Sequence, residues 1–235
     1  MSDDASAAPA MPSAGDRATA PAAARTFDVR HVQVGRALLA AVAAIMVTFS
    51  SDHSAPVGLA IFSGWVVATA LVLLVAAWLV YPKGRRATPI LLGVLALVAG
   101  MVTGIPGIRS TTLFFVVVIA WALASGIAEL VAGIRGIRSR RTDGVAAGED
   151  RDRVLIGALT VALGLGLLLV NPAYSLEYVL PDVDVASTLT GITIAVGLFG
   201  GYAAIIAVFL GIAGFSPRRP AVVATVAPGE RSGSQ

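Results

Sequence analysis

Residues 111–135 read TTLFFVVVIAWALASGIAELVAGIR, a stretch in which Glu129 is the one charged residue before the terminal Arg135. A membrane-spanning helix needs about 20 largely apolar residues, so this run is long enough to cross a bilayer. It is apolar all round, without the polar face that a surface helix of a soluble protein turns to water. The stretch therefore predicts a transmembrane helix that carries a carboxylate within the hydrocarbon.

Further apolar windows lie on both sides of this stretch, each bounded by charged residues or a histidine. The first is about five residues short of a full span, but Val32 and Val34 can extend it while Arg36 reaches outward to the lipid headgroups. Residues 1–30 and 216–235 are rich in small residues, Pro or Gly, and are expected to be disordered cytoplasmic tails. We expect an all-α integral membrane protein whose six transmembrane helices lie at about 34–51, 57–81, 88–107, 111–135, 153–172 and 186–214.

The composition excludes several classes of protein. Of the 235 residues, 57% are hydrophobic and 13% charged, whereas a soluble domain has about 25% charged residues. The chain has no cysteine and two histidines, which excludes disulfides and thiolate chemistry and leaves too few ligands for most metal sites. Because GxSxG, Walker and HExxH motifs are also absent, we expect no enzymatic activity, no cofactor and no metal site.

The basic residues predict the orientation. With the N-terminus placed in the cytoplasm, sixteen of the seventeen Lys and Arg residues fall in cytoplasmic segments, and Arg109 alone lies outside. This bias predicts a multi-pass protein of the inner (plasma) membrane with both termini cytoplasmic. It also explains the net charge of +3 without nucleic acid, because the basic residues do not form a stripe interleaved with aromatics.

A repeat divides the apolar region into similar parts. An aliphatic pair followed by a small residue begins every odd-numbered span, as Leu38-Leu39-Ala40, Leu91-Leu92-Gly93 and Leu155-Ile156-Gly157. Gly100 and Gly164 each follow seven residues after the glycine of their own copy, so each pair lies on one helix face. The pattern predicts three tandem helical hairpins.

This pattern resembles the HdeD-like acid-resistance membrane proteins, which are built from a short hydrophobic hairpin repeat of unknown function. The closest stretch is 90–136, where Trp121, then Gly126, then Arg135 match the family's Trp, Gly and basic exit. A weaker copy runs over 154–214, and the first hairpin departs most, with Ala40 and Ala70 in place of glycines. The resemblance implies six helices and a link to acid stress, and it supplies no catalytic residues.

Glu129 is the main functional candidate, and with Trp121 and Gly126 it marks the most distinctive patch of the chain. A carboxylate inside a span usually faces a bundle interior or a wet cavity, but Glu129 is also close enough to Arg135 to reach the cytoplasmic interface. Glu129 shares a helix face with Ala122, Gly126 and Gly133, so we expect it to face other helices. A Ser, Thr or Tyr on another span is the expected partner, in preference to an Arg.

Small residues spaced four apart let two helix backbones come close in a bilayer. Helix packing is therefore predicted at Gly100, Gly104, Gly197 and Gly201, and the repeat adds Gly93, Gly157 and Gly164. Packing within one chain is the simpler interpretation, and a homo-oligomer interface is the alternative.

The sequence favours a structural or stress-protective membrane protein without catalytic activity, whose partner is the lipid bilayer and for which no small-molecule ligand is known. The alternative is a small transporter or proton-conducting pathway that uses Glu129. A wet, helix-lined pocket around Glu129 would favour transport, and contact with headgroups or Arg135 would favour the structural role.

Overall fold

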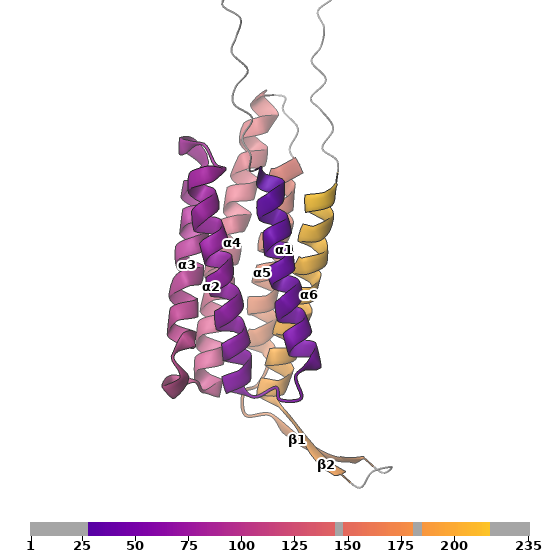
Figure 1. Cartoon of the computed structure of the whole chain (residues 1–235). Helices are drawn as coiled ribbons and strands as arrows, with labels where there is room; N and C mark the ends of the chain where they lie inside the picture. Colours follow the sequence, from indigo (N-terminus) through magenta and orange to yellow (C-terminus); the bar gives the residue numbers. More distant parts are fainter. Residues whose placement is uncertain (1–27, 144–147, 181–184, 217–235) are drawn as a thin grey trace, which may run out of the picture.

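The structure, a computed structural model, describes residues 28–143, 148–180 and 185–216. All six helices in this part are long and apolar enough to cross a membrane, which confirms the all-α multi-pass fold. They run alternately up and down in one bundle (Figure 1): α1 (Val29–Phe49), α2 (Ala55–Leu79), α3 (Ala87–Gly104), α4 (Thr111–Asp143), α5 (Gly148–Leu169) and α6 (Gly191–Phe215).

The two ends of the bundle differ in charge. We call one the Arg-rich end, where α1 begins and α6 ends (Figure 1). The basic residues at this end are Arg30, Lys83, Arg85, Arg86, Arg135, Arg138, Arg151 and Arg153. The other is the hairpin end, where Arg109 lies. The Arg109 guanidinium donates to the carbonyl oxygens of Thr103 and Gly104 at 3.1 and 3.3 Å, so this isolated cation caps the last turn of α3.

Local hydrogen bonds account for where two helices begin. The Asp28 carboxylate accepts from the Val29 N–H, and the Asp28 N–H donates to the His31 ring. This capping box starts α1 at Val29, earlier than the expected residue 34. The Thr190 hydroxyl oxygen accepts from the Thr193 N–H, so α6 begins at Gly191.

The predicted sixth span is wrong at its start, because residues 185–190 form a strand. Strands β1 (Ser175–Leu180) and β2 (Val185–Thr190) pair antiparallel, with Ser175 opposite Thr190, and extend beyond the bundle (Figure 1). The sequence holds a signal for this hairpin, since two runs rich in Tyr, Val and Thr flank Pro181-Asp182. The expected tails lie outside the described residues except at 28–30 and Ser216.

The helices pack most closely in three pairs: α2 with α3, α4 with α5, and α6 with α1. Each pair joins the second helix of one predicted hairpin to the first helix of the next, and α6 closes the ring onto α1. Helices within one predicted hairpin are neighbours but make looser contact. The packing unit is therefore not the hairpin that the repeat predicts.

Glycines lie at the closest contacts of these pairs. A Cβ added to Gly157 would lie 2.6 Å from the Leu130 nitrogen of α4, and one added to Gly164 would lie 2.8 Å from Leu123. Gly93 and Gly100 meet α2 in the same way, through Leu74 and Val67, and Gly104 is close to Ser63. The expectation for these five glycines agrees with the structure.

The expectation for Gly197 and Gly201 does not agree with it. A Cβ added at either position would meet nothing within 4 Å in the described part of the chain. The glycines of α6 that approach α1 are Gly200, against Val47, and Gly214, against Val34. Glycines of α6 do lie at the contact with α1, but the four-residue spacing did not identify which ones, because it cannot distinguish adjacent registers of an all-apolar helix.

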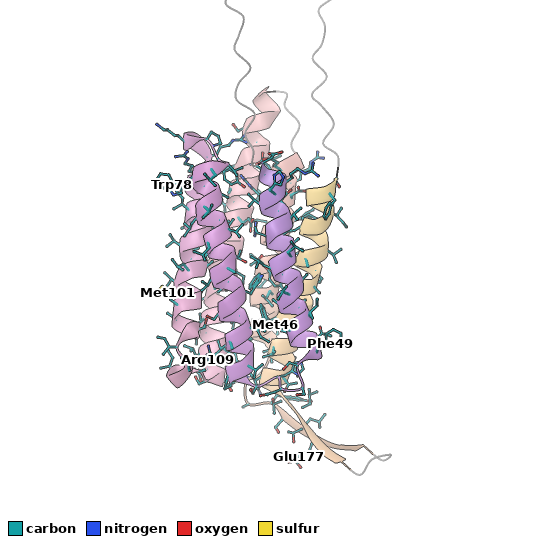
Figure 2. All side chains as sticks on the ribbon, in the orientation of Figure 1. Met46, Phe49, Trp78, Met101, Arg109 and Glu177 are labelled. Carbon is teal, nitrogen blue, oxygen red and sulfur yellow. The ribbon has the colours of Figure 1, made fainter. Side chains whose placement is uncertain are left out.

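The bundle surface is apolar, as a lipid-facing surface must be. Met46, Phe49, Trp78 and Met101 project away from the helices (Figure 2) and are more than half exposed. Inside, aromatic side chains from α2, α4 and α6 meet near the axis. Phe62 packs against Trp121 and Phe199 with ring centroids 5.3 and 5.6 Å apart.

Candidate functional site

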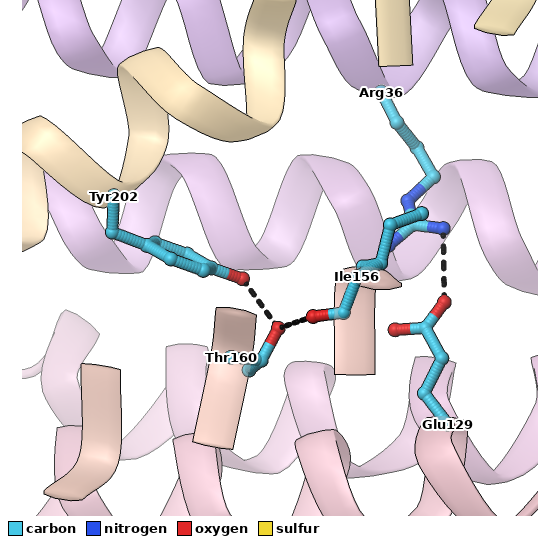
Figure 3. A network of polar contacts seen from close by, with 5 residues as sticks. All are labelled: Arg36, Glu129, Ile156, Thr160 and Tyr202. Carbon is cyan, nitrogen blue, oxygen red and sulfur yellow. Dashed lines mark hydrogen bonds and ion pairs between the residues drawn. The ribbon is translucent and has the colours of Figure 1, made fainter. Parts of the chain in front are cut away.

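Glu129 lies inside the bundle and is 5% exposed. It belongs to the face of α4 that the sequence identified, where Ala122 is buried and Gly126 and Gly133 contact α5. The expectation that Glu129 faces other helices is therefore confirmed. Its carboxylate is directed toward α1 and the Arg36 guanidinium (Figure 3).

The partner of Glu129 is an arginine, so the expectation of a Ser, Thr or Tyr partner is wrong. Arg36 Nη1 lies 3.5 Å from Glu129 Oε1, and the Arg36 side chain is 17% exposed. Arg36 was expected to reach outward to headgroups, but it turns inward because the buried carboxylate offers it a counter-charge. At 3.5 Å the pair is longer than a charge-assisted hydrogen bond of about 2.7 to 2.9 Å.

Two cavities meet at this ion pair. The central cavity, of about 30 Å³, is lined by residues of all six helices, and the entrance cavity, of about 40 Å³, lies toward the Arg-rich end. A water molecule needs about 10 to 15 Å³ of such space, so each cavity can hold water. The residues that line both are Arg36, Leu73, Leu92, Glu129 and Leu210.

The entrance cavity reaches the Arg-rich end of the bundle. Its lining includes Val29 at the start of α1, Tyr81 after the end of α2, and Glu149 in the first turn of α5, all of them half-buried. Arg153 also lines it and lies over the Tyr81 ring at 5.8 Å. Polar and charged side chains therefore line the way from this end to Glu129.

The opposite side of the central cavity is aromatic. Trp65 and Trp121 line the cavity and pack edge to face, with ring centroids 5.4 Å apart. Beyond them toward the hairpin end lie Phe62, Phe114 and Phe199, which are fully buried. We call Trp65, Trp121, Phe62 and Phe199 the aromatic floor, because they lie between the cavity and the hairpin end. The contacts of Trp121 with Phe62 and Trp65 of α2 confirm the prediction that Trp121 packs against another helix.

Hydroxyl groups supply the remaining polar lining. Thr160 of α5 donates to the Ile156 carbonyl oxygen at 2.8 Å, so the Tyr202 hydroxyl of α6 donates to Thr160 Oγ1, also at 2.8 Å (Figure 3). Ser125 donates to the Trp121 carbonyl oxygen. The bond between Tyr202 and Thr160 joins α6 to α5, and all three hydroxyl side chains line the central cavity.

Of the three patch residues expected from the sequence, the structure brings Glu129 and Trp121 to the cavity and assigns Gly126 to helix packing. Gly126 contacts Val161 and Gly157 of α5, where an added Cβ would lie 2.8 Å from the Val161 nitrogen. The pairing that sequence reasoning missed is with Arg36, which lies in the weakest predicted span. The missed polar lining is Thr69, Ser125, Thr160 and Tyr202.

A repeat signal could have found part of this lining. A shift of 56 residues carries Trp65 onto Trp121 and Thr69 onto Ser125, and it carries Leu73 onto Glu129. Leu73 and Glu129 both line both cavities. Glu129 is thus a carboxylate at a position where the preceding copy has an aliphatic side chain.

Comparison of the chain with protein-family models, with curated proteins and with solved structures finds no match.

Proposed function

We propose that this protein is a small transporter-type protein of the plasma membrane that carries protons through its interior, with Glu129 as the proton site. The observation that supports the proposal is the buried Arg36–Glu129 pair at the junction of two cavities. An ionisable pair inside a membrane bundle commonly belongs to a proton or ion pathway. The position of Glu129 supports the same proposal, since its carboxylate lines helix-lined cavities large enough for water and pairs with Arg36.

Geometry supports one-sided access to Glu129. The entrance cavity connects it to the Arg-rich end, and the aromatic floor lies between it and the hairpin end. We place the Arg-rich end in the cytoplasm because of the bias in basic residues. A complete transport cycle then requires the aromatic side chains to move, as alternating access demands of any carrier.

A structural or stress-protective role, linked to acid resistance by the resemblance to the HdeD-like proteins, is the second candidate. The observation that favours it is the dense packing of the hairpin half, where Phe62, Phe114 and Phe199 are fully buried. In that case Arg36–Glu129 serves as a polar anchor between α1 and α4.

Proton flux in liposomes distinguishes the two candidates. We expect purified wild-type protein to carry protons down an imposed pH gradient, and Glu129→Gln to abolish the flux because an amide cannot exchange a proton. Glu177→Gln is the matched control, since it removes the same group from the exposed hairpin (Figure 2) and should keep wild-type flux. Equal flux in empty and wild-type liposomes would exclude the transport proposal.

A further inference from the structure

Three side chains that line the central cavity carry buried hydrogen-bond donors that no group in the described part of the chain accepts from. The indole nitrogens of Trp65 and Trp121 and the hydroxyl of Thr69 have no hydrogen-bond partner among the described residues. Each of these three side chains is at least nine-tenths buried, and all three line the same cavity. An indole nitrogen can only donate, and leaving a buried donor unpaired costs free energy. The cavity is therefore built for a group that accepts hydrogen bonds.

The charges of Arg36 and Glu129 determine under which condition the hydrogen-bond acceptor in the cavity would be an anion. With Glu129 ionised, its charge cancels that of Arg36. Protonating Glu129 leaves the guanidinium as an uncompensated positive charge inside the bundle, which is strongly unfavourable in a low-dielectric interior. An anion in the cavity would neutralise this charge and accept from the free donors at once.

We propose that the central cavity binds one small monovalent anion together with a proton on Glu129. Trp65, Trp121 and Thr69 would donate hydrogen bonds to the anion, and Arg36 would supply the opposite charge. The volume of about 30 Å³, against about 10 to 15 Å³ for a water molecule, has room for a halide ion. This inference deepens the proposed function, because it uses the same proton site and makes the cargo a neutral pair of proton and anion.

The other ionisable groups near Glu129 are few. Arg36 faces it from α1, Tyr202 lines the central cavity from α6, and the remaining groups lie in the entrance cavity, namely Tyr81, Glu149, Asp152 and Arg153. The lining residues of α2 and α3 are not ionisable: Trp65, Thr69, Leu73, Thr88, Pro89, Leu92 and Ala96. Glu129 is thus the carboxylate that lines the central cavity together with the donors, and its charge controls whether the cavity binds an anion.

Bromide quenching of indole fluorescence tests the proposal. The chain has three tryptophans, and Trp78 is exposed, so a Trp78→Phe background leaves the two indoles of the cavity as reporters. We would titrate bromide into this protein in chloride-free detergent at about pH 4 and about pH 7.5, an acidic and a near-neutral value. We expect saturable quenching at the lower pH and affinity weaker by at least about tenfold at the higher pH, because proton and anion binding are coupled reciprocally.

Three variants in this background locate the site. Thr69→Val should weaken bromide binding several-fold, whereas Thr103→Val should not, because the buried Thr103 hydroxyl donates to carbonyl oxygens of its own helix, α3. Glu129→Gln should bind bromide equally at both pH values, because the amide is neutral throughout. If Thr69→Val does not fold, the Glu129→Gln comparison still decides the question.

Linear quenching that is the same at both pH values and in Glu129→Gln would overturn the proposal, since it indicates random collision without a site. The liposome assay separates this failure from that of the proposed function. Saturable bromide binding without proton flux would support the anion site and refute the proposed proton transport. Proton flux without bromide binding would support the proton pathway and refute the anion site.

Discussion

Arg36 and Glu129 depend on each other, because removing either leaves the other charge buried without a partner. We expect Glu129→Leu and Arg36→Met each to lower the free energy of unfolding by about 3 kcal/mol. The double variant should recover most of this loss, since Leu73 already occupies the equivalent cavity position on α2. Thermal unfolding of all four proteins in detergent measures the coupling. If the two losses simply add, the pair does not interact.

Glu129→Gln should be milder than Glu129→Leu, because its amide oxygen can still accept from Arg36. The same unfolding experiment checks this order. A Gln variant as unstable as the Leu variant would mean that the charge of Glu129, and not its hydrogen bonding, stabilises α4 against α1.

At the scale of helices, the glycine contacts predict which positions tolerate a side chain. We expect Gly164→Leu to reduce the yield of folded protein, because its Cβ would lie 2.8 Å from Leu123 across the contact between α5 and α4. Gly166→Leu is the matched control on the same helix, where an added Cβ meets nothing within 4 Å. Size-exclusion profiles and melting temperatures compare the two. Equal losses of folded protein in both variants would show that the effect comes from helix propensity and not from the packing of α5 against α4.

The helices themselves could be predicted from charge-free windows, because the need to satisfy every backbone polar group in lipid makes a long apolar run a helix. The neighbours of each helix could not be predicted in this way. Gly93 and Gly157 repeat in the sequence, which correctly marked contact positions, but nothing in an apolar sequence says whether the contact is made with the following helix or the preceding one.

The ion pair escaped prediction for a related reason. Glu129 stood out as a carboxylate in an apolar run, whereas Arg36 lies near the edge of a short span, where an arginine usually reaches the headgroups. Only the contact between α1 and the rest of the ring, closed by α6, brings the two side chains together. The β1–β2 hairpin was missed because the residues of β2 were counted as the start of the long apolar window that begins near Asp184.

At the scale of the whole molecule, the split of basic residues predicts the orientation. Reporter fusions in the Lys83 segment and at the C-terminus should both report a cytoplasmic location, and a fusion between β1 and β2 should report an external one. The structure places the Lys83 segment and the end of α6 at the same end of the bundle (Figure 1). A cytoplasmic signal from the hairpin fusion would reverse the membrane orientation that we propose.

One-sided access to the buried ion pair is the central claim, and cysteine protection tests it most directly, because the chain has no cysteine of its own. Thr69→Cys, in the central cavity, would be exposed to silver ions from one side of sealed vesicles and then assayed for free thiol after denaturation. Gln33→Cys in the entrance cavity serves as the positive control, and the buried Thr103→Cys outside both cavities as the negative one. We predict that Thr69→Cys reacts with silver much faster from the Arg-rich side than from the hairpin side, where access requires the aromatic floor to move. Equal or faster reaction from the hairpin side, or none from either side while Gln33→Cys reacts, would contradict the claim.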